Sequence, residues 1–284
     1  MPRPPPRLRP EEYEPDEDGL PRAIVGAWVK EKHLRLQHYV GATRAARRNY
    51  IGPGNAGATY IDLFCGPARA RIEQTTEVID GSPLVAWRQS FADGVPFTSV
   101  HIADAHPQLV EATCIRLKSA DASVHEDVGK AASVVDRVIA RLDPYGLHFA
   151  FLDPYGLKDL PFEVLRRLAS LKRMDMLIHV SVLGLQRNLK PFARSRACAL
   201  DSFAPGWRSA VDPRHIDANA RARVLAHWRD LLRSLGVEVA DAIELVRADD
   251  NQPLYWLAFA ARHPLAIQIW ERISQIDRQG RFGF

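Results

Sequence analysis

The stretch that decides the fold runs from Tyr60 to Ala70 and reads Tyr-Ile-Asp-Leu-Phe-Cys-Gly-Pro-Ala-Arg-Ala. It begins as a short apolar run that ends in Asp62, and it then turns through Gly66 and Pro67. This order is typical of a buried parallel strand that leads into a ligand-binding loop. Glycine lets the backbone approach a ligand closely, and an aspartate there can accept hydrogen bonds from hydroxyl or amino groups. The stretch therefore predicts a binding site where a central strand ends.

Two further acids follow the next predicted strands. Residues 98–103 read as a second strand that ends at Asp104, and residues 124–127 read as a third strand that includes Asp127. In doubly wound folds that bind nucleotides, an acid after the second strand accepts hydrogen bonds from ribose hydroxyls. We expect Asp104 in that role and Asp127 as a weaker candidate, facing an adenine amino group. Residues 71–80 are polar and read as an irregular insertion between the first two strands.

A second informative stretch, residues 148–156, reads His-Phe-Ala-Phe-Leu-Asp-Pro-Tyr-Gly. An apolar strand here places Asp153, Pro154 and Tyr155 at the carboxyl edge of the sheet. The stretch resembles a motif of methyltransferases that act on base amines, in which a carboxylate and a backbone carbonyl accept hydrogen bonds from the exocyclic amine of a flipped base while an aromatic ring stacks on the base. The alternative is a simple turn after a strand, because residues 143–146 repeat the same tetrapeptide, Asp-Pro-Tyr-Gly, in an apparent loop.

Strands and helices alternate along the remainder of the chain. Residues 237–246 and 254–261 read as two strands with a tight connection, which is most simply antiparallel. The pattern predicts an α/β, doubly wound, Rossmann-like sheet that is mostly parallel and has an antiparallel C-terminal strand. A mainly helical insertion is expected at about residues 190–235.

The first twenty residues differ in composition from the chain that follows. Residues 1–20 are rich in proline and carry arginines followed by an acidic run, so they predict a disordered tail. Their opposed charges could dock on a partner, or the segment could simply be solvated. Residues 21–284 are expected to form a single domain with an N-terminal helical segment.

Overall composition sets few limits on partners. The chain has 284 residues, of which 46% are hydrophobic, and its formal net charge is +4. Any attraction for nucleic acid must therefore come from local patches. The three cysteines are far apart and form no Cys-x-x-Cys pair, which argues against a structural zinc site or disulfides and favours a reducing cytoplasm. No apolar stretch approaches the roughly 20 residues that span a bilayer.

Two basic segments have open interpretations. From Ala27 to about Arg48, apolar residues recur at helical spacing beside a basic side, which predicts an amphipathic helix or helix pair. Lys32 and His33 in that segment could lie near the active cleft, or they could be a surface lysine and a satisfied histidine. The later run from Arg187 to Arg196 contains four basic residues and no acid, and it could hold phosphates or be an ordinary solvated loop.

Taken together and in order, these motifs resemble the three-Cys-motif partner proteins, the TcmP family. The motifs are Lys32-His33 with Tyr39, residues 62–67, Gly81-Ser82-Pro83-Leu84, residues 151–156, and the ending from Pro253-Leu254-Tyr255-Trp256 through His263-Pro264 to Trp270. The resemblance implies a methyltransferase-type doubly wound fold. It also implies a separate partner, a radical-SAM-like protein that carries the cysteine motif.

The turn also looks like the first motif of S-adenosylmethionine-dependent methyltransferases, Asp-x-Phe-x-Gly. That resemblance implies cofactor contacts from a set of residues in the turn and after the next strands. The set is Asp62, Phe64, Gly66, Pro67, Asp104 and Asp127. The Asp153 stretch similarly resembles the Asp-Pro-Pro-Tyr motif of methyltransferases that act on base amines, although it is one proline shorter.

The helix before the turn is similar to that of single-domain ribosomal RNA adenine methyltransferases. This likeness implies that Lys32 and His33 lie by the substrate, that Gly66 lies beside the cofactor and that Asp153 meets the methyl-accepting amine. Arg187, from the basic run, is the third expected substrate contact. One departure is Ala68, which stands where the TcmP family has a second glycine and whose methyl group is expected to narrow the cofactor pocket.

Two hypotheses of function follow. The first is a cytoplasmic S-adenosylmethionine-dependent methyltransferase that modifies a nucleobase amine in nucleic acid. The alternative is a non-catalytic, methyltransferase-like module that binds nucleic acid or its three-Cys-motif partner. No Ser-His-Asp order and no metal-binding cluster recommends hydrolysis or a metal-dependent reaction.

Overall fold

The computed structural model describes residues 8–9, 11–212, 216–217, 219–241, 244–247 and 253–280. The chain forms two compact units, residues 1–152 and residues 153–284. Each unit has strands and helices of its own. Whether residues 21–284 act as one domain, as the sequence suggests, stays a prediction.

The first unit is built on four parallel strands. Strand β3 pairs in parallel with β6 on one side and with β8 on the other, and β6 pairs in parallel with β7. Every residue of β3 is buried, as expected for a strand covered on both faces. The strands are β3 (Ala58–Asp62), β6 (Ser99–Asp104), β7 (Val124–Val128) and β8 (Leu147–Leu152).

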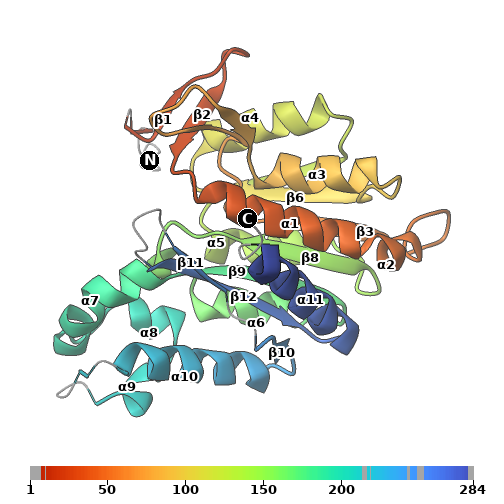
Figure 1. Ribbon diagram of the computed structural model, residues 1–284. Coiled ribbons are helices and arrows are strands. Elements are labelled where there is room, and N and C mark those ends of the chain that lie inside the picture. Colours follow the sequence, from red (N-terminus) through yellow and green to blue (C-terminus); the bar gives the residue numbers. More distant parts are fainter. Residues whose placement is uncertain are drawn as a thin grey trace. The chain divides into compact units, whose positions relative to one another are not determined.

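Helices connect these strands in the manner that the sequence predicts. The helices are α3 (Ser82–Ala92), α4 (Pro107–Lys118) and α5 (Ala131–Ala140). Figure 1 shows α3 and α4 on the same side of β6, and the two helices contact each other. The order β8-β3-β6-β7 reverses direction after β7, and right-handed crossovers then place α5 on the opposite face. The predicted α/β, doubly wound fold class is confirmed.

The predicted amphipathic segment is a helix pair, α1 (Val29–Ala42) and α2 (Arg44–Arg48), and α1 packs on α3. Its expected basic side is only partly exposed, because Lys32, Arg35 and Arg47 are buried. The Arg47 guanidinium donates to the carbonyl of Val95 at 3.1 Å and pairs with Asp93. Arginine can be buried here because its donors meet acceptors inside the protein.

A second, smaller sheet corrects two expectations. Its strands are β1 (Tyr13–Pro15), β2 (Pro21–Val25), β4 (Arg69–Ile72) and β5 (Val78–Asp80), in the order β1-β2-β4-β5. The predicted disordered tail is therefore wrong for residues 11–20, and the predicted irregular insertion is wrong where β4 and β5 form. The Glu14 carboxylate accepts hydrogen bonds from Arg22 and Arg71, so the charges that suggested disorder are paired across strands. Residues 1–7 lie outside the described residues.

The second unit contains the predicted antiparallel C-terminal strand. Strand β12 runs antiparallel to β9, and both β10 and β11 also pair antiparallel with β12. The elements are a 3-10 turn η1 (Leu157–Asp159), α6 (Phe162–Leu168), β9 (Met174–Ser181), β10 (Glu238–Val239), β11 (Glu244–Arg247), β12 (Pro253–Ala261) and α11 (Pro264–Gly280).

The helical insertion, predicted at about residues 190–235, begins earlier than expected because its first helix is α7 (Val182–Arg194). It continues with α8 (Ala199–Phe203), α9 (Trp207–Ala210) and α10 (Ala220–Ser234). Its aromatic residues form a core of their own. Trp207 and Trp228 are fully buried, and the Trp228 ring stacks on Phe203 with the centroids 5.4 Å apart. The insertion is held by this packing, since large buried aromatic rings contribute strongly to core stability.

Gly81 provides a test of the close packing at the start of α3. Its amide donates to the carbonyl of Ala68 at 2.7 Å, and an added Cβ would lie 2.8 Å from the Ala68 Cα. Since that neighbour is backbone, we expect Gly81→Ala to lower the free energy of unfolding by about 1–3 kcal/mol, measured by urea denaturation.

Gly41→Ala in α1 is the matched control for that substitution. Its added Cβ would lie 3.4 Å from the flexible Gln89 side chain, and alanine favours a helix by up to about 1 kcal/mol. Gly41→Ala is therefore expected to keep or raise stability. A Gly81→Ala variant as stable as Gly41→Ala would contradict the packing described between Gly81 and Ala68.

Candidate functional site

The Asp62 carboxylate organises the turn after β3. It is fully buried and accepts hydrogen bonds from the Tyr60 hydroxyl at 3.1 Å, the Phe64 amide at 3.1 Å and the Ser82 hydroxyl at 2.7 Å. Helix α3 has no side-chain cap at its N-terminus, and the hydroxyl of Ser82, its first residue, serves Asp62 instead. Asp62 thus fixes the path of the chain toward Gly66, and direct contact between Asp62 and a cofactor stays a prediction.

Gly66 and Asp104 meet at the carboxyl ends of β3 and β6, as the sequence predicts. The Gly66 amide donates to Asp104 Oδ2 at 3.3 Å, and the His106 amide donates to Asp104 Oδ1 at 2.9 Å. Gly66 has a φ of 54°, a left-handed conformation that favours glycine. Among the residues that the structure describes, no atom apart from those of its two neighbours in the chain lies within 4 Å of the position that a Cβ would take on Gly66. The turn therefore borders open space beside an acid.

The two acids also surround the Cys65 thiol. Cys65 is buried, and its amide donates to the carbonyl of Ala103 at 3.0 Å. Burial, together with the charges of Asp104 and Asp62, raises the pKa of this thiol well above its usual value. Burial likewise raises the pKa of Asp104. Cys65 is therefore a neutral packing residue, because nucleophilic cysteines require a lowered pKa.

Ala68 does not project into an open pocket. Its backbone has a φ of 60°, a region that residues other than glycine rarely adopt, and the residue is 1% exposed. Because the Ala68 methyl group is covered by other residues, it does not narrow a cofactor pocket, contrary to the expectation from the sequence. Ala68 instead stores local backbone strain, of order 1 kcal/mol, in the turn that follows Gly66. Pro67, between them, is buried as well.

Asp127 is engaged by arginines in and just after α5. Its carboxylate pairs with Arg137 at 2.9 Å and with Arg141 at 2.5 Å. Burial alone would raise the pKa of Asp127, but the hydrogen bonds from Arg141 and Arg137 outweigh it and hold the pKa below its usual value. These contacts fasten α5 to β7. The expected contact with an adenine stays a prediction.

The neighbouring His101 yields a prediction about pH. Burial, followed by the nearby His125 and Arg141, lowers the pKa of His101 from 6.5 to about 3, and its ring stacks on that of His125 at 4.5 Å. The native state keeps His101 neutral, while the unfolded chain binds a proton below pH 6.5. The free energy of unfolding should therefore fall as the pH drops from 6.5 toward 3, by up to about 1.4 kcal/mol per pH unit from this group.

Urea unfolding between pH 4 and 7 would measure that dependence, with both pH limits chosen from the titration window. In the apolar variant His101→Leu, the slope of the free energy of unfolding against pH should be smaller by the contribution of one proton. The control His38→Asn, at an exposed position of α1, should keep it. Equal slopes for the wild type and His101→Leu would show that His101 is not held neutral.

The proposed catalytic stretch begins the second unit. Asp153 Oδ1 lies 3.4 Å from His179 Nδ1, and the His179 ring packs on Tyr255 with the centroids 4.4 Å apart. Pro154 is buried, whereas Tyr155 is 79% exposed. The structure thus brings Asp153 together with two residues to which sequence reasoning gave no site role. The signal for His179 is a polar residue inside the apolar run of β9.

The other copy of the tetrapeptide is a turn, which confirms its interpretation as a loop. Asp143 Oδ1 accepts a hydrogen bond from the Tyr145 amide at 2.8 Å, and its carbonyl accepts one from Gly146 at 2.9 Å. Tyr145 is 66% exposed. The two copies share sequence and an exposed tyrosine. They differ because Asp153 follows a strand directly and its carboxylate lies 3.4 Å from the His179 ring, whereas Asp143 meets His148 through its backbone carbonyl at 2.9 Å.

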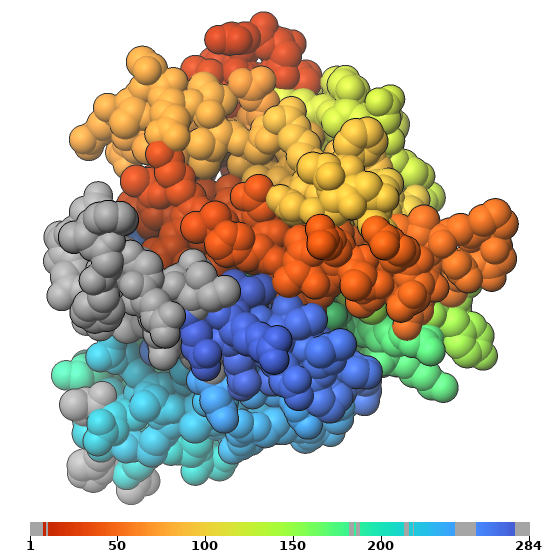
Figure 2. Space-filling model, turned by 45° about the vertical axis from the view of Figure 1, so that its right-hand side comes forward, coloured from red at the N-terminus to blue at the C-terminus, as the bar shows by residue number. Residues whose placement is uncertain are grey.

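The remaining expected substrate residues are on helices. Lys32 and His33 belong to α1; Lys32 is 6% exposed and His33 is partly exposed. Together with α2 and the loop of residues 51–57, α1 forms the orange-red band across the face shown in Figure 2. Arg187 lies in α7, so the expected loop is helical there, and its side chain lies outside the described part of the chain. A substrate role for these three residues stays a prediction.

The described residues contain neither a metal-binding cluster nor a membrane-spanning helix. No group of three or more histidine, cysteine, aspartate or glutamate side chains in the described ranges could hold a metal ion. Likewise, no helix in that part of the chain is long and apolar enough to cross a lipid bilayer.

The strand orders of the two units define an α/β protein with a Rossmann-like, methyltransferase-type fold. No family model and no curated protein sequence matches the chain. Solved structures in which the chain follows a similar course include protein LPL1258 from Legionella pneumophila, described by the family model DUF519. Its sequence is 10% identical, the TM-score is 0.48, and the match covers 84% of this chain and 89% of that chain.

Two more solved structures have a similar chain course. One is cofactor-bound Rv0187 from MTB, at 16% identity and a TM-score of 0.44, covering 86% of this chain and 84% of that chain. The other is the O-methyltransferase from Bacillus cereus in complex with SAH, at 11% identity and a TM-score of 0.41, covering 79% and 90%. At these identities the similarity concerns the course of the chain and not what this protein binds.

Proposed function

We propose that this chain is an S-adenosylmethionine-dependent methyltransferase that acts on a nucleobase amine in nucleic acid. The observation that carries the proposal is the bond between the Gly66 amide and Asp104, beside open space at the carboxyl ends of β3 and β6. In parallel α/β sheets, ligands bind in the crevice outside the carboxyl ends of the strands.

The residues of this turn fit such a cofactor. Gly66 offers backbone that a ligand can approach. The Asp104 carboxylate still has lone pairs for a ligand after it accepts hydrogen bonds from the amides of Gly66 and His106. Phe64 and Pro67 flank the same turn, while Asp62 holds it in place. When bound, the cofactor supplies an activated methyl group on a sulfonium, so the protein needs chiefly to bind and orient the acceptor.

In the second unit, Asp153 would accept a hydrogen bond from the amine of the base. His179, 3.4 Å from Asp153, acts as a positioning residue because it restricts where that carboxylate can point. Tyr155 presents a largely exposed ring on which a base can stack, and the buried Pro154 holds the backbone between them. Lys32, His33 and Arg187 complete the proposal as contacts to the nucleic acid.

Cofactor binding can be tested at Asp104. Loss of its charge in Asp104→Asn should weaken S-adenosylmethionine by roughly 10-fold to 100-fold, because hydrogen bonds to a charged group contribute about 1.5–3 kcal/mol. Since burial raises the pKa of this carboxyl, its charge does not stabilise the native state. Unfolding free energy should change by less than about 1.5 kcal/mol. Isothermal titration calorimetry measures the affinity, and urea denaturation measures the stability.

Asp121→Asn is the matched control, because it makes the same charge change at an exposed position just after α4. It should leave the affinity for the cofactor unchanged. Absence of measurable binding by the folded wild-type chain at about 1 mM cofactor would remove the enzyme from consideration.

The repeated tetrapeptide provides a control within the chain for the catalytic step. Asp153→Asn should reduce transfer of a labelled methyl group to nucleic acid by roughly 100-fold or more, because the lost carboxylate positions the amine. Asp143→Asn changes the same residue of the loop copy and should leave transfer unchanged. Tyr155→Ala should weaken substrate binding by about 1–3 kcal/mol, with Tyr145→Ala as its control.

Equal activity of Asp153→Asn and Asp143→Asn would show that both copies of the tetrapeptide have a structural role and that neither takes part in methyl transfer. The measurement requires a nucleic acid that the wild-type chain methylates, and short single-stranded RNA and DNA pools are the first substrates to compare.

Cytoplasmic location is part of the same proposal.

A second candidate is the non-catalytic module that accompanies a radical-SAM-like three-Cys-motif protein, as the TcmP resemblance implies. One observation favours it: Asp62 is fully buried and already accepts hydrogen bonds from three groups. If Asp153→Ala keeps full biological activity while loss of the partner abolishes it, this candidate replaces the enzyme.

A further inference from the structure

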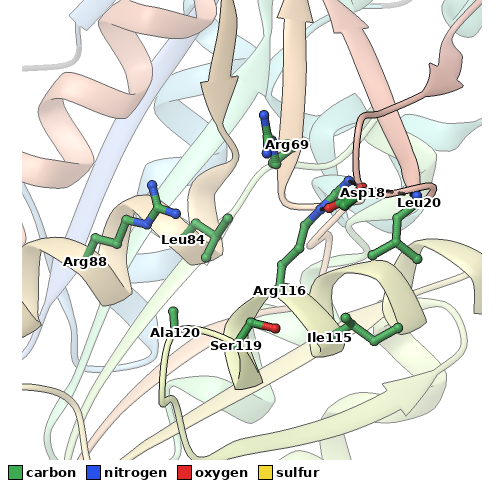
Figure 3. Close-up of a pocket in the computed structure, with 9 residues that line it drawn as sticks. All are labelled: Asp18, Leu20, Arg69, Leu84, Arg88, Ile115, Arg116, Ser119 and Ala120. Atoms are coloured by element: carbon green, nitrogen blue, oxygen red, sulfur yellow. Dashed lines mark hydrogen bonds and ion pairs between the residues drawn. The ribbon is translucent and has the colours of Figure 1, made fainter.

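A cavity of about 440 Å³ lies within the first unit, apart from the residues proposed to hold the cofactor. Figure 3 shows it between α3, α4 and the strands of the small sheet. Its lining combines arginines with aliphatic side chains. Those that matter for the argument are Leu20, Arg69, Leu84, Arg88, Ile115 and Arg116. The volume suits a small organic molecule, since ligand pockets commonly measure about 300–1,000 Å³.

Arg116 is part of the cavity wall but has no donor left for a ligand. Its side chain is 5% exposed. Its guanidinium donates twice to the Asp18 carboxylate, once to Asp16, and once each to the carbonyls of Pro21 and Pro67. Because a guanidinium has five N–H donors, this set is complete. Arg116 therefore fixes the N-terminal strands against α4 and closes one side of the cavity.

Arg69 and Arg88 differ from Arg116 in this respect. Arg69 Nε pairs with Asp16 at 2.9 Å, and Arg88 Nη1 pairs with Asp80 at 2.6 Å. Their side chains are 31% and 61% exposed. Each guanidinium has further N–H groups beyond these contacts. In Figure 3 the two side chains reach the cavity from different elements, Arg69 from β4 and Arg88 from α3.

Apolar side chains lie among these arginines in the lining. Leu84 is buried at the start of α3, and Leu20 lies in the turn before β2. Ile115 on α4 is 45% exposed, a high value for an isoleucine. A ligand with an apolar body would cover Ile115 and remove that surface from water, at about 25 cal/mol per Å².

We propose that this cavity binds a small organic phosphate monoester, with its phosphate held by Arg69 and Arg88 and its apolar body against Leu84 and Ile115. A phosphate monoester carries a charge of about −1.5 to −2 at neutral pH and three terminal oxygens, which suits two arginines from different elements. Asp18 is the acid in the lining, and Arg116 hydrogen bonds lower its pKa and occupy both of its oxygens. Asp18 therefore repels the phosphate less than a free acid would.

The experiment uses the full chain and phenyl phosphate as the probe, with binding measured by isothermal titration calorimetry. We expect a dissociation constant of about 1 mM or lower. Benzyl alcohol, which has the ring without the charge, and benzoate, which carries a single carboxylate, should bind at least about fivefold more weakly. Benzoate or benzyl alcohol binding as tightly as phenyl phosphate would overturn the assignment to a phosphate.

Variants place the binding at this cavity. Arg88→Gln should weaken phenyl phosphate binding by about fivefold or more, and the variant should stay folded because the Arg88 side chain is exposed. Arg166→Gln alters an exposed arginine paired with Glu163 in the second unit and should have no effect. Ile115→Ser should weaken phenyl phosphate but not inorganic phosphate. Unchanged affinity in Arg88→Gln, or no binding at about 10 mM probe, would overturn the proposal.

Discussion

The buried Asp62 carboxylate is the constraint on which the first unit depends. A charged group without exposure to water is costly unless its lone pairs are satisfied, and here a tyrosine hydroxyl, a serine hydroxyl and the Phe64 amide satisfy them. The three donors come from β3 itself, from the turn after it and from the start of α3. One side chain thereby joins strand, turn and helix, and it sets the path that brings Gly66 to Asp104.

Strands β3, β6 and β8 of the parallel sheet could be predicted from sequence because each is a largely apolar run bounded by turn residues, whereas β7 carries three polar residues and was predicted as a short strand closed by acids. The antiparallel β12 followed in the same way from the short connection before it. The small sheet could not be predicted, because β2 finds its parallel partner in β4, more than forty residues later. Glu14 and Asp16 looked like solvated charges, and only the folded chain shows the arginines that neutralise them.

At the candidate site, sequence located the acids but not their environments. Asp104 was found because it follows a strand, and the structure adds the amides that hold it. Asp127 was found by the same rule, yet arginines near α5 occupy its carboxylate, and no local pattern reveals that pairing. His179 was missed because a single histidine in an apolar strand is usually a core residue. Its meaning comes from the distance to Asp153, which depends on the folding of the second unit.

The saturated guanidinium of Arg116 has a consequence for any shortened form of this protein. Proline-rich and acidic ends of this kind are often removed to improve expression or crystallisation. A chain that started at Pro21 would lack Asp16 and Asp18, which accept three of the five Arg116 hydrogen bonds. A buried cation would then be left with two carbonyls as its partners, at a cost of about 3–5 kcal/mol. Trimming would thus weaken the fold from α4 to the turn at Pro67, although the composition of the removed residues gives no sign of this role.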